Sequence, residues 1–336
     1  MKITIRQVQG NSGADVWAEN LCRGLHTAGY DCQVDLRSII YQFCSMPGFM
    51  KDSFEHSDII QSNSWNGYAF KEDCPLVVTE HHVVHDPAFT PYKTAGQKSF
   101  HQWIFHCEKK TFRSADAIVT VSEYTRNMTE KIFGLSDTQM IYNGIDTTFF
   151  KPVPVYREKW GIPDDVCILL NTGNLSLRKG ADLLPVIMKE LGDRFLLLTT
   201  SGNPFIPGTP IRNIRDIGYL RQEQLVDAYN LCDIFLTPTR LEGFGLSVAE
   251  AMACGKPVVA TNCSSIPELI VNEKGGFLCG MDNVQEYADR IRYLADHPDE
   301  QVRMGVFNRQ RINDLFTVEK MTNEYLDLYK AVMITR

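Results

Sequence analysis

The second half of the chain contains a glycine-bearing turn between a predicted strand and a predicted helix. The turn has the sequence EGFG at positions 242–245, and the helix is expected from about Leu246 to Cys254, with Gly255 after it. Glycines at such a turn let a ligand approach the backbone closely. The free N–H groups and the dipole of the helix then favour an anion, usually a phosphate. The turn therefore predicts a phosphate site.

Two carboxylates flank this turn. Glu242 opens it, and Glu250 follows eight residues later on the predicted helix. A carboxylate beside phosphates repels them unless it is aimed at hydroxyl groups, and its two acceptor oxygens suit a ribose diol or sugar hydroxyls. The whole arrangement predicts a nucleotide-sugar site. The alternative is an ordinary strand-to-helix turn with surface glutamates.

A second group of candidate residues follows a predicted strand in the first half of the chain. The sequence EHHVVHDPAF contains His81, His82, His85 and Asp86, and such a dense cluster can bind a metal ion. Strand alternation points His81 and His82 in opposite directions, so these two cannot easily share a metal. His82, His85 and Asp86 could converge only if a turn or helix begins there. A metal-dependent hydrolase is therefore one alternative, and histidines that only pack in a loop are another.

The elements that position these residues alternate between strand and helix in both halves. Strand-length runs are continuously apolar, which is typical of parallel strands covered on both faces by helices, so the predicted fold class is α/β. The segment SSIPEL is expected to start a helix with a capping box between Ser265 and Glu268, and Val318–Met333 is expected to be helical. The predicted strands are Ile3–Val8, Cys32–Leu36, Asp58–Gln61, Leu76–Thr79, Ala117–Val121, Cys167–Asn171, Phe195–Thr199, Ile234–Pro238 and Pro257–Thr261.

Length and composition limit the class of protein. The chain has 336 residues, enough for about two domains that each have a core. The two prolines in Phe150–Pro154 suit a linker between them. Its 34 Lys and Arg against 41 Asp and Glu give a net charge of −7, which argues against a nucleic-acid partner.

The expected location is the cytoplasm. No apolar run approaches the ~18 residues of a membrane span, and the first residues, MKITIRQVQG, do not resemble a signal peptide. The ten cysteines are scattered and form no CxxC motif, as expected in a reducing compartment. The segment Phe100–Arg113 combines aromatic and basic residues, and we expect it to pack on its sheet rather than on a membrane. Any membrane contact is therefore expected to be peripheral, at the inner face.

The segment 242–270, EGFGLSVAEAMACGKPVVATNCSSIPELI, resembles the donor-site signature of the retaining family-4 glycosyltransferases, which have the GT-B fold. The resemblance covers most of the chain. Ser12-Gly13 resembles the family's Gly-Gly turn, VTEHH at 78–82 resembles the segment that supplies a histidine, here His81, and 141–152 resembles the segment before the interdomain linker.

This resemblance implies two Rossmann-like domains with a cleft between them. Residues 1–152 would form the acceptor-side domain, 153–315 the donor domain, and 316–336 a helix that packs back on the first domain. The implied reaction moves a hexose-type sugar from a nucleoside-diphosphate sugar to a hydroxyl acceptor, with retention. A UDP-sugar is favoured over a GDP-sugar, and the acceptor is a glycan, a lipid-linked molecule, a growing polysaccharide or a small molecule. A GT-B nucleotide-sugar epimerase is the alternative.

The resemblance also assigns residue roles. Lys179 would neutralise the leaving diphosphate, but Asn174 stands where the family usually has an arginine. Arg178 is expected to compensate in part, since adjacent side chains rarely point the same way. The chain has no DxD motif, so neither a metal nor another cofactor is expected. The implied catalytic residues are Lys179, Glu242 and His81, and the implied donor-binding residues are Gly13, Asn174, Arg178, Lys179, Glu242, Gly243, Phe244, Gly245, Leu246 and Glu250.

Overall fold

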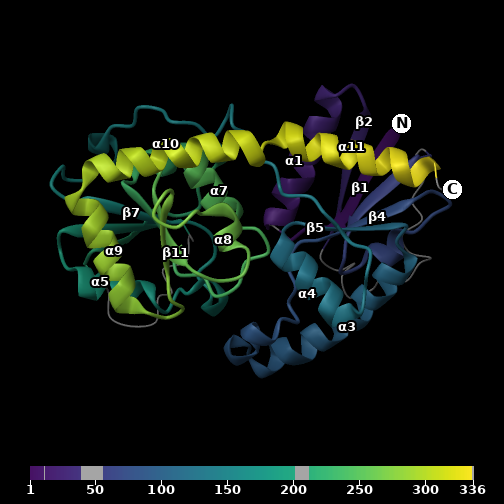
Figure 1. The fold of residues 1–336 in the computed structure, drawn as a ribbon, viewed down its shortest axis with the longest axis horizontal. Coiled ribbons are helices and arrows are strands. Elements are labelled where there is room, and N and C mark those ends of the chain that lie inside the picture. The colour runs from purple at the N-terminus through teal and green to yellow at the C-terminus, as the bar shows by residue number, and fades with distance from the viewer. Residues whose placement is uncertain (11, 39–55, 201–211, 335–336) are drawn as a thin grey trace. The chain divides into compact units, whose positions relative to one another are not determined.

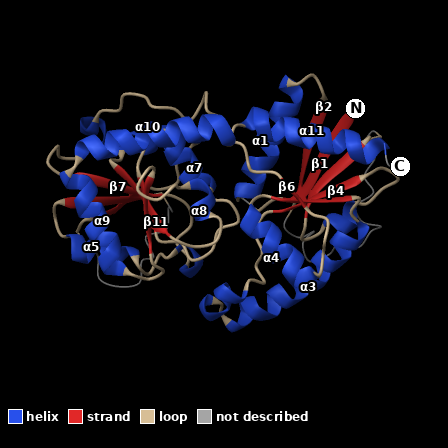
Figure 2. Cartoon of the chain, in the orientation of Figure 1, coloured by secondary structure: helices blue, strands red, loops and turns tan. Residues whose placement is uncertain are grey.

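The computed structural model describes residues 1–10, 12–38, 56–200 and 212–334. These residues form two compact units. The first unit comprises Met1–Gly144 together with Phe316–Arg336, and the second comprises Ile145–Leu315. Each unit is a parallel sheet covered by helices (Figures 1 and 2). The α/β class predicted from the continuous apolar runs is confirmed in both units.

The first unit contains a six-stranded sheet with the order β2-β1-β3-β4-β5-β6. All of its pairings are parallel. The direction of strand addition reverses between β1 and β3, and ligands of such sheets bind at the carboxyl ends of the strands beside a reversal. The strands are β1 (Lys2–Val8), β2 (Asp31–Arg37), β3 (Ile59–Asn63), β4 (Leu76–Glu80), β5 (Ala117–Thr120) and β6 (Gln139–Met140).

Helices α1 (Gly13–Thr27) and α11 (Val318–Ile334) cover one face of this sheet, and α3 (Ala95–Ser114) and α4 (Glu123–Phe133) lie on the other (Figure 1). The C-terminal helix is bound closely. A Cβ atom on Gly24 of α1 would lie 2.0 Å from Thr322 Oγ1 of α11, so the glycine permits the contact. Tyr325 and Tyr329 of α11 are fully buried, and their hydroxyls bond to side chains of the sheet.

The second unit has a six-stranded parallel sheet of order β12-β11-β10-β7-β8-β9, whose reversal lies between β10 and β7. Helices α5 and α9 share a hydrophobic core with the sheet, while α6 and α7 contact each other and β7, β10 or β11. The strands are β7 (Cys167–Asn171), β8 (Phe195–Thr199), β9 (Ile214–Asp216), β10 (Ile234–Thr237), β11 (Val258–Thr261) and β12 (Gly276–Cys279). The helices are α5 (Leu184–Leu191), α6 (Gln222–Leu231), α7 (Leu246–Ala253), α8 (Ile266–Leu269), α9 (Val284–Asp296) and α10 (Pro298–Leu315).

Each of the nine predicted strands is present, with ends that differ by at most two residues. Strands β6, β9 and β12 were not predicted from the sequence, and all three are short strands at the edge of a sheet. No disulfide joins any of the nine cysteines in the described part of the chain. No helix among the described residues is long and apolar enough to cross a bilayer.

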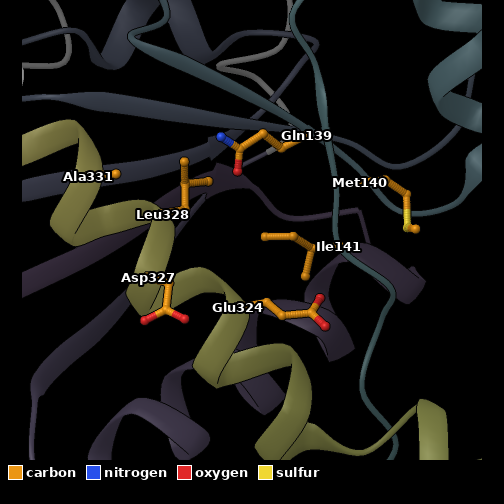
Figure 3. Close-up of a pocket in the computed structure, with 7 residues that line it drawn as sticks. All are labelled: Gln139, Met140, Ile141, Glu324, Asp327, Leu328 and Ala331. Carbon is orange, nitrogen blue, oxygen red and sulfur yellow. The ribbon is translucent and has the colours of Figure 1, made fainter.

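A pocket of about 380 Å³ lies in the first unit between α11 and the segment at β6 (Figure 3). It contains none of the predicted site residues. Its lining residues are Gln139, Met140, Ile141, Glu324, Asp327, Leu328 and Ala331.

Candidate functional site

The loops after β7 and β10 flank the strand-order reversal of the second unit and are therefore its expected ligand loops. The loop after β7 ends in a short 3-10 turn, η4 (Leu177–Lys179), and Gly180 follows it. Gly180 has φ +69°, and a Cβ atom there would lie 1.9 Å from the carbonyl oxygen of Pro238. Glycine thus lets this loop lie directly on the end of β10, where it brings Lys179 next to Glu242.

Two cations meet the carboxylate of Glu242. Lys179 Nζ lies 2.5 Å from Glu242 Oε1, and Arg178 Nη1 lies 3.6 Å from Glu242 Oε2. Arg178 also donates a hydrogen bond of 2.7 Å to the carbonyl oxygen of Leu241. The expectation that Arg178 and Lys179 diverge is wrong, because the tight 3-10 turn directs both side chains to opposite oxygens of one carboxylate.

The position of Glu242 is fixed by hydroxyl groups on three sides. Thr239 Oγ1 donates a hydrogen bond of 3.0 Å to Glu242 Oε1. The backbone N–H of Glu242 donates a hydrogen bond of 2.9 Å to Ser264 Oγ. Ser265 Oγ donates to the carbonyl oxygen of Glu242 at 3.1 Å and makes no capping bond to α8. The predicted capping box between Ser265 and Glu268 is therefore wrong, because this hydroxyl holds the turn before α7 instead.

The turn at 242–245 enters α7 through Gly245, which has φ +100°. A Cβ atom on Gly245 would lie 3.1 Å from Ile266 Cδ1 and 3.2 Å from Leu269 Cδ1 of α8, so glycine suits both the backbone and the packing. Because the N-cap residue is glycine, no side chain caps α7. The N–H groups of its first turn, beginning at Leu246, are left for an anion, and the helix dipole favours one.

Arg240, which was not predicted from the sequence as a site residue, connects the two ligand loops. Its guanidinium forms a bidentate pair with Asp182 at 2.7 and 2.8 Å, and Nε donates to Asp282 at 2.8 Å. Nη1 also donates to the carbonyl oxygen of Leu177 at 2.6 Å, and the backbone N–H of Arg240 donates to the carbonyl oxygen of Arg178 at 2.8 Å. These bonds hold η4 in place.

The second carboxylate, Glu250, projects from α7 and is 8% exposed. Tyr229 of α6 donates its hydroxyl to Glu250 Oε2 at 2.7 Å, and that hydroxyl lies 3.2 Å from Thr172 Oγ1 after β7. Burial raises the pKa of Glu250 to about 7, and the bond from Tyr229 and the charge of Lys179 oppose this rise. Burial lowers the pKa of Lys179, while Glu242 opposes the fall.

The predicted donor residues of the second unit lie on these two loops and on α7. Asn174 is exposed, and its Oδ1 accepts a hydrogen bond of 3.4 Å from Ser176 Oγ. The ring of Phe244 is buried. The residues that the structure brings to this region are Asn174, Arg178, Lys179, Glu242, Gly243, Phe244, Gly245, Leu246 and Glu250.

The other two predicted residues, Gly13 and His81, belong to the first unit. Gly13 is the first residue of α1, whose start is closed by a capping box between Ser12 and Asp15. His81 follows β4, and its ring centroid lies 4.6 Å from that of Trp17 in an edge contact. Burial lowers the pKa of His81 to about 3, so the imidazole is neutral, and its buried Nε2 has no hydrogen-bond partner in the described part of the chain.

His85 and Asp86, which belong to the alternative metal site, instead form hydrogen bonds with other groups of the protein. His85 Nε2 lies 2.7 Å from Glu108 Oε2. Asp86 accepts a 2.8 Å hydrogen bond from the N–H of Ala88 and another from the hydroxyl of Tyr124. Within the described ranges, no three His, Cys, Asp or Glu side chains are placed to hold a metal ion together. The metal-dependent hydrolase therefore lacks a ligand set there.

A carboxyl pair that was not predicted from the sequence lies next to this histidine loop. Glu80 at the end of β4 is 1% exposed, and Glu108 of α3 is 0% exposed. Burial raises the pKa of both groups, that of Glu108 to about 8, and the neighbouring Glu108 raises that of Glu80 further. Two such carboxyls cannot both be ionised, so the pair holds a proton at neutral pH.

Comparison with known proteins gives two family matches. The model of Glycosyltransferase Family 4 matches residues 42–149, and the model of Glycosyl transferases group 1 matches residues 210–311, together well over half of the chain. The chain is 26% identical over 230 residues to N-acetyl-alpha-D-glucosaminyl L-malate synthase of Bacillus anthracis. That alignment covers 65% of this chain and spans 60% of the length of the relative.

Solved structures share the fold over the whole chain. The sucrose-phosphate synthase of Thermosynechococcus elongatus superposes with a TM-score of 0.84 at 18% identity, covering 100% of both chains. Anabaena Alr3699/HepE in complex with UDP and glucose superposes with a TM-score of 0.79 at 18% identity, covering 98% of this chain and 99% of that one. With its two six-stranded parallel sheets and its two family matches, the chain belongs to the family-4 glycosyltransferases, the glycosyl transferases group 1, of GT-B fold.

Proposed function

We propose that this protein is a retaining glycosyltransferase that moves a hexose-type sugar from a nucleoside-diphosphate sugar to a hydroxyl acceptor. The observation that carries the proposal is the meeting of Lys179 and Arg178 on the buried carboxylate of Glu242, one turn before the uncapped start of α7. Cations and free N–H groups suit a diphosphate, and carboxylates suit hydroxyls. Few other ligands combine both chemistries.

In this proposal, Lys179 and the first turn of α7 neutralise the diphosphate as the glycosidic bond breaks. Glu242 accepts hydrogen bonds from the sugar, and Glu250 accepts them from the ribose diol. A departing phosphate oxygen takes the acceptor proton on the face of the sugar that it leaves, which retains the anomeric configuration. The protein then contributes orientation and charge stabilisation rather than a covalent nucleophile.

The proposed donor is a UDP-sugar, with a GDP-sugar as the second candidate. The Anabaena structure of the same fold contains UDP and glucose, which supports the first choice by analogy. The proposed acceptor is a glycan, a lipid-linked molecule, a growing polysaccharide or a small molecule, reached in the cytoplasm or at the inner face of the membrane. His81 is neutral, and its Nε2 has no hydrogen-bond partner among the described residues; it is proposed to contact the sugar or the acceptor.

The first experiment is a thermal-shift screen with UDP, GDP, ADP and TDP, because a nucleotide that binds the folded state raises the unfolding temperature. The sugar nucleotides of the best base are then incubated with candidate acceptors, and NMR reports the anomeric configuration of the product. Transfer with retention that persists in EDTA is expected. Inversion, or a complete loss in EDTA that Mg²⁺ or Mn²⁺ restores, contradicts the proposal. Epimerised sugar formed without any acceptor supports the epimerase instead.

A further inference from the structure

The hydroxyl of Tyr229 links three elements around the strand-order reversal of the second unit. Tyr229 of α6 is fully buried, and its hydroxyl lies between Glu250 Oε2 of α7, at 2.7 Å, and Thr172 Oγ1 after β7, at 3.2 Å. A tyrosine hydroxyl has one proton to donate, and an ionised carboxylate can only accept. The proton of Tyr229 therefore goes to Glu250, and the hydroxyl oxygen is left to accept from Thr172.

From this relay we infer that Tyr229, held by Thr172, is a positioning residue that orients the Glu250 carboxylate toward the ribose diol of the donor. The inference rests on the proposed function, because it takes Glu250 as the ribose contact. It adds two residues that do not themselves touch the ligand. With Oε2 bound to Tyr229, the plane of the carboxylate is fixed and Oε1 remains for a ligand hydroxyl.

The surroundings of Glu250 make this role measurable through pH. The ionisable groups that shift its pKa are Tyr229 of α6 and Lys179 of the loop after β7, and Glu250 in turn raises the pKa of Cys254, the residue that follows α7. Burial raises the pKa of Glu250 to about 7, whereas the hydrogen bond from Tyr229 and the charge of Lys179 favour the ionised form. Burial and the neighbouring Glu250 raise the pKa of Tyr229, so this phenol stays protonated and donates.

Removing the Tyr229 hydroxyl therefore changes two things. The carboxylate loses the bond that fixes its orientation, and its pKa rises further because one stabiliser of the charged form is gone. Binding of a diol by the ionised carboxylate should weaken near neutral pH and recover in part as the pH rises. A substitution that only loosens the packing would weaken binding equally at all pH values.

The experiment is calorimetry of UDP and, in parallel, GDP binding between pH 6 and 9, without any sugar. The nucleotide that binds wild type should bind Tyr229→Phe about tenfold more weakly at pH 7. This is the loss of affinity expected when a hydrogen bond to a charged group is removed. In this variant the loss of affinity at acid pH should begin at a higher pH than in wild type. Thr172→Val should shift the profile in the same direction by less, and it serves as the test if Tyr229→Phe does not fold.

Tyr287→Phe is the matched control. Tyr287 is a second fully buried tyrosine of the same unit, and its hydroxyl lies 2.6 Å from a threonine, Thr261 Oγ1, with no carboxylate in the pair. Affinity and pH profile should match wild type in this variant. Equal losses at all pH values in Tyr229→Phe and Tyr287→Phe would overturn the positioning role.

Glu250→Ala separates this inference from the proposed function. If Glu250→Ala loses nucleotide affinity while Tyr229→Phe and Thr172→Val retain both the affinity and the pH profile of wild type, the positioning role is wrong and the ribose role of Glu250 stands. If Glu250→Ala binds the nucleotide like wild type, the ribose role is wrong and the positioning role fails with it.

Discussion

Both units place buried carboxylates at the carboxyl ends of their sheets, but the partners of these carboxylates differ. In the second unit Glu242 faces Lys179 and Arg178, and Glu250 faces the hydroxyl of Tyr229. In the first unit Glu80 faces another carboxyl group, that of Glu108. A carboxylate with cationic or hydroxyl partners can stay charged, whereas a carboxyl pair must hold a proton.

The two strand-to-helix turns show the same contrast. The start of α1 is closed by a capping box between Ser12 and Asp15, which also adds a negative charge to the first turn. The start of α7 has only Gly245 at its N-cap, so its N–H groups and its dipole remain open to an anion. The contrast supports the proposed site for an anionic ligand with hydroxyl groups in the second unit. In the first unit the contact proposed above is made by His81, which is neutral.

The largest expected effect is that of Lys179→Ala. If Lys179 neutralises the leaving diphosphate, its loss should lower kcat about 100-fold, the scale seen when one preorganised group that stabilises transition-state charge is removed. Steady-state kinetics with the donor found in the nucleotide screen measures this. Lys189→Ala is the control, because Lys189 is an exposed lysine of α5 in the same unit. Near-normal kcat in Lys179→Ala would show that the phosphate site is misplaced.

The two glutamates of the second unit should separate in a binding experiment. Glu250→Ala should weaken binding of the bare nucleoside diphosphate by about 1.5–3 kcal/mol, the value of a hydrogen bond to a charged group. Glu242→Ala should leave that affinity close to wild type, because its proposed ligand is the sugar and its loss releases Lys179 and Arg178 for the phosphates. Calorimetry with the nucleotide alone decides between them. Equal losses in both variants would refute the division of roles.

The carboxyl pair of the first unit predicts a pH dependence of stability. The folded protein holds a proton on Glu80 and Glu108 at pH values where the unfolded chain has released it. The contribution of this proton to the free energy of unfolding is therefore complete below ~4.3, the pKa of Glu in the unfolded chain. The contribution is lost as the pH rises toward about 8, by about 1.4 kcal/mol for each unit by which the folded pKa exceeds the unfolded one. Burial lowers the pKa of His85 to about 4, so this histidine is neutral across most of the window.

Glu108→Gln tests this dependence. An amide carries no charge at any pH and can donate to the remaining carboxylate of Glu80, so the fall in unfolding temperature between pH 5 and 8 should become smaller. Glu19→Gln on the exposed side of α1 is the control, and it should keep the slope of wild type. The same slope in Glu108→Gln as in wild type would show that the pair does not share a proton.

The sequence predicted the central strands well because they are largely buried, and several, such as β7 (CILLN) and β8 (FLLLT), are almost continuously apolar. β6 has the sequence QM and β9 the sequence IRD, and both are exposed edges with few apolar residues. β12, GFLC, is an apolar strand at the other edge of the same sheet as β9, and it too was not predicted. β6 and β9 depend on their neighbouring strands more than on their own residues, so no local apolar pattern in the sequence signals these two.

The chemistry of the site was more predictable than its supports. The glycine turn, Lys179 and the two glutamates all belong to short sequence motifs of the second unit. The structure brings them together at the strand-order reversal of that unit. Arg240 and Tyr229 act through contacts that span 21 to 63 residues of sequence, which no local pattern records. The Glu80–Glu108 pair joins a strand end to a distant helix, and a buried glutamate cannot be distinguished in sequence from an exposed one.

The smallest expected effect concerns Asn174 and Arg178, where the chain departs from its family. In the free protein Lys179 and Arg178 each lie next to one oxygen of the Glu242 carboxylate. For Arg178 to reach a bound donor, its guanidinium must either leave Glu242 and the Leu241 carbonyl or contact them and the donor together. If Arg178 then supplies part of the missing charge in the transition state, Arg178→Ala should lower kcat a few-fold, less than Lys179→Ala, and change KM little. Asn174→Arg adds the usual charge at an exposed position and should restore the kcat of Arg178→Ala in the double variant. The alternative is that Lys179 alone carries the charge. In that case Arg178→Ala should have the kcat of wild type, and Asn174→Arg should raise kcat in the otherwise wild-type protein.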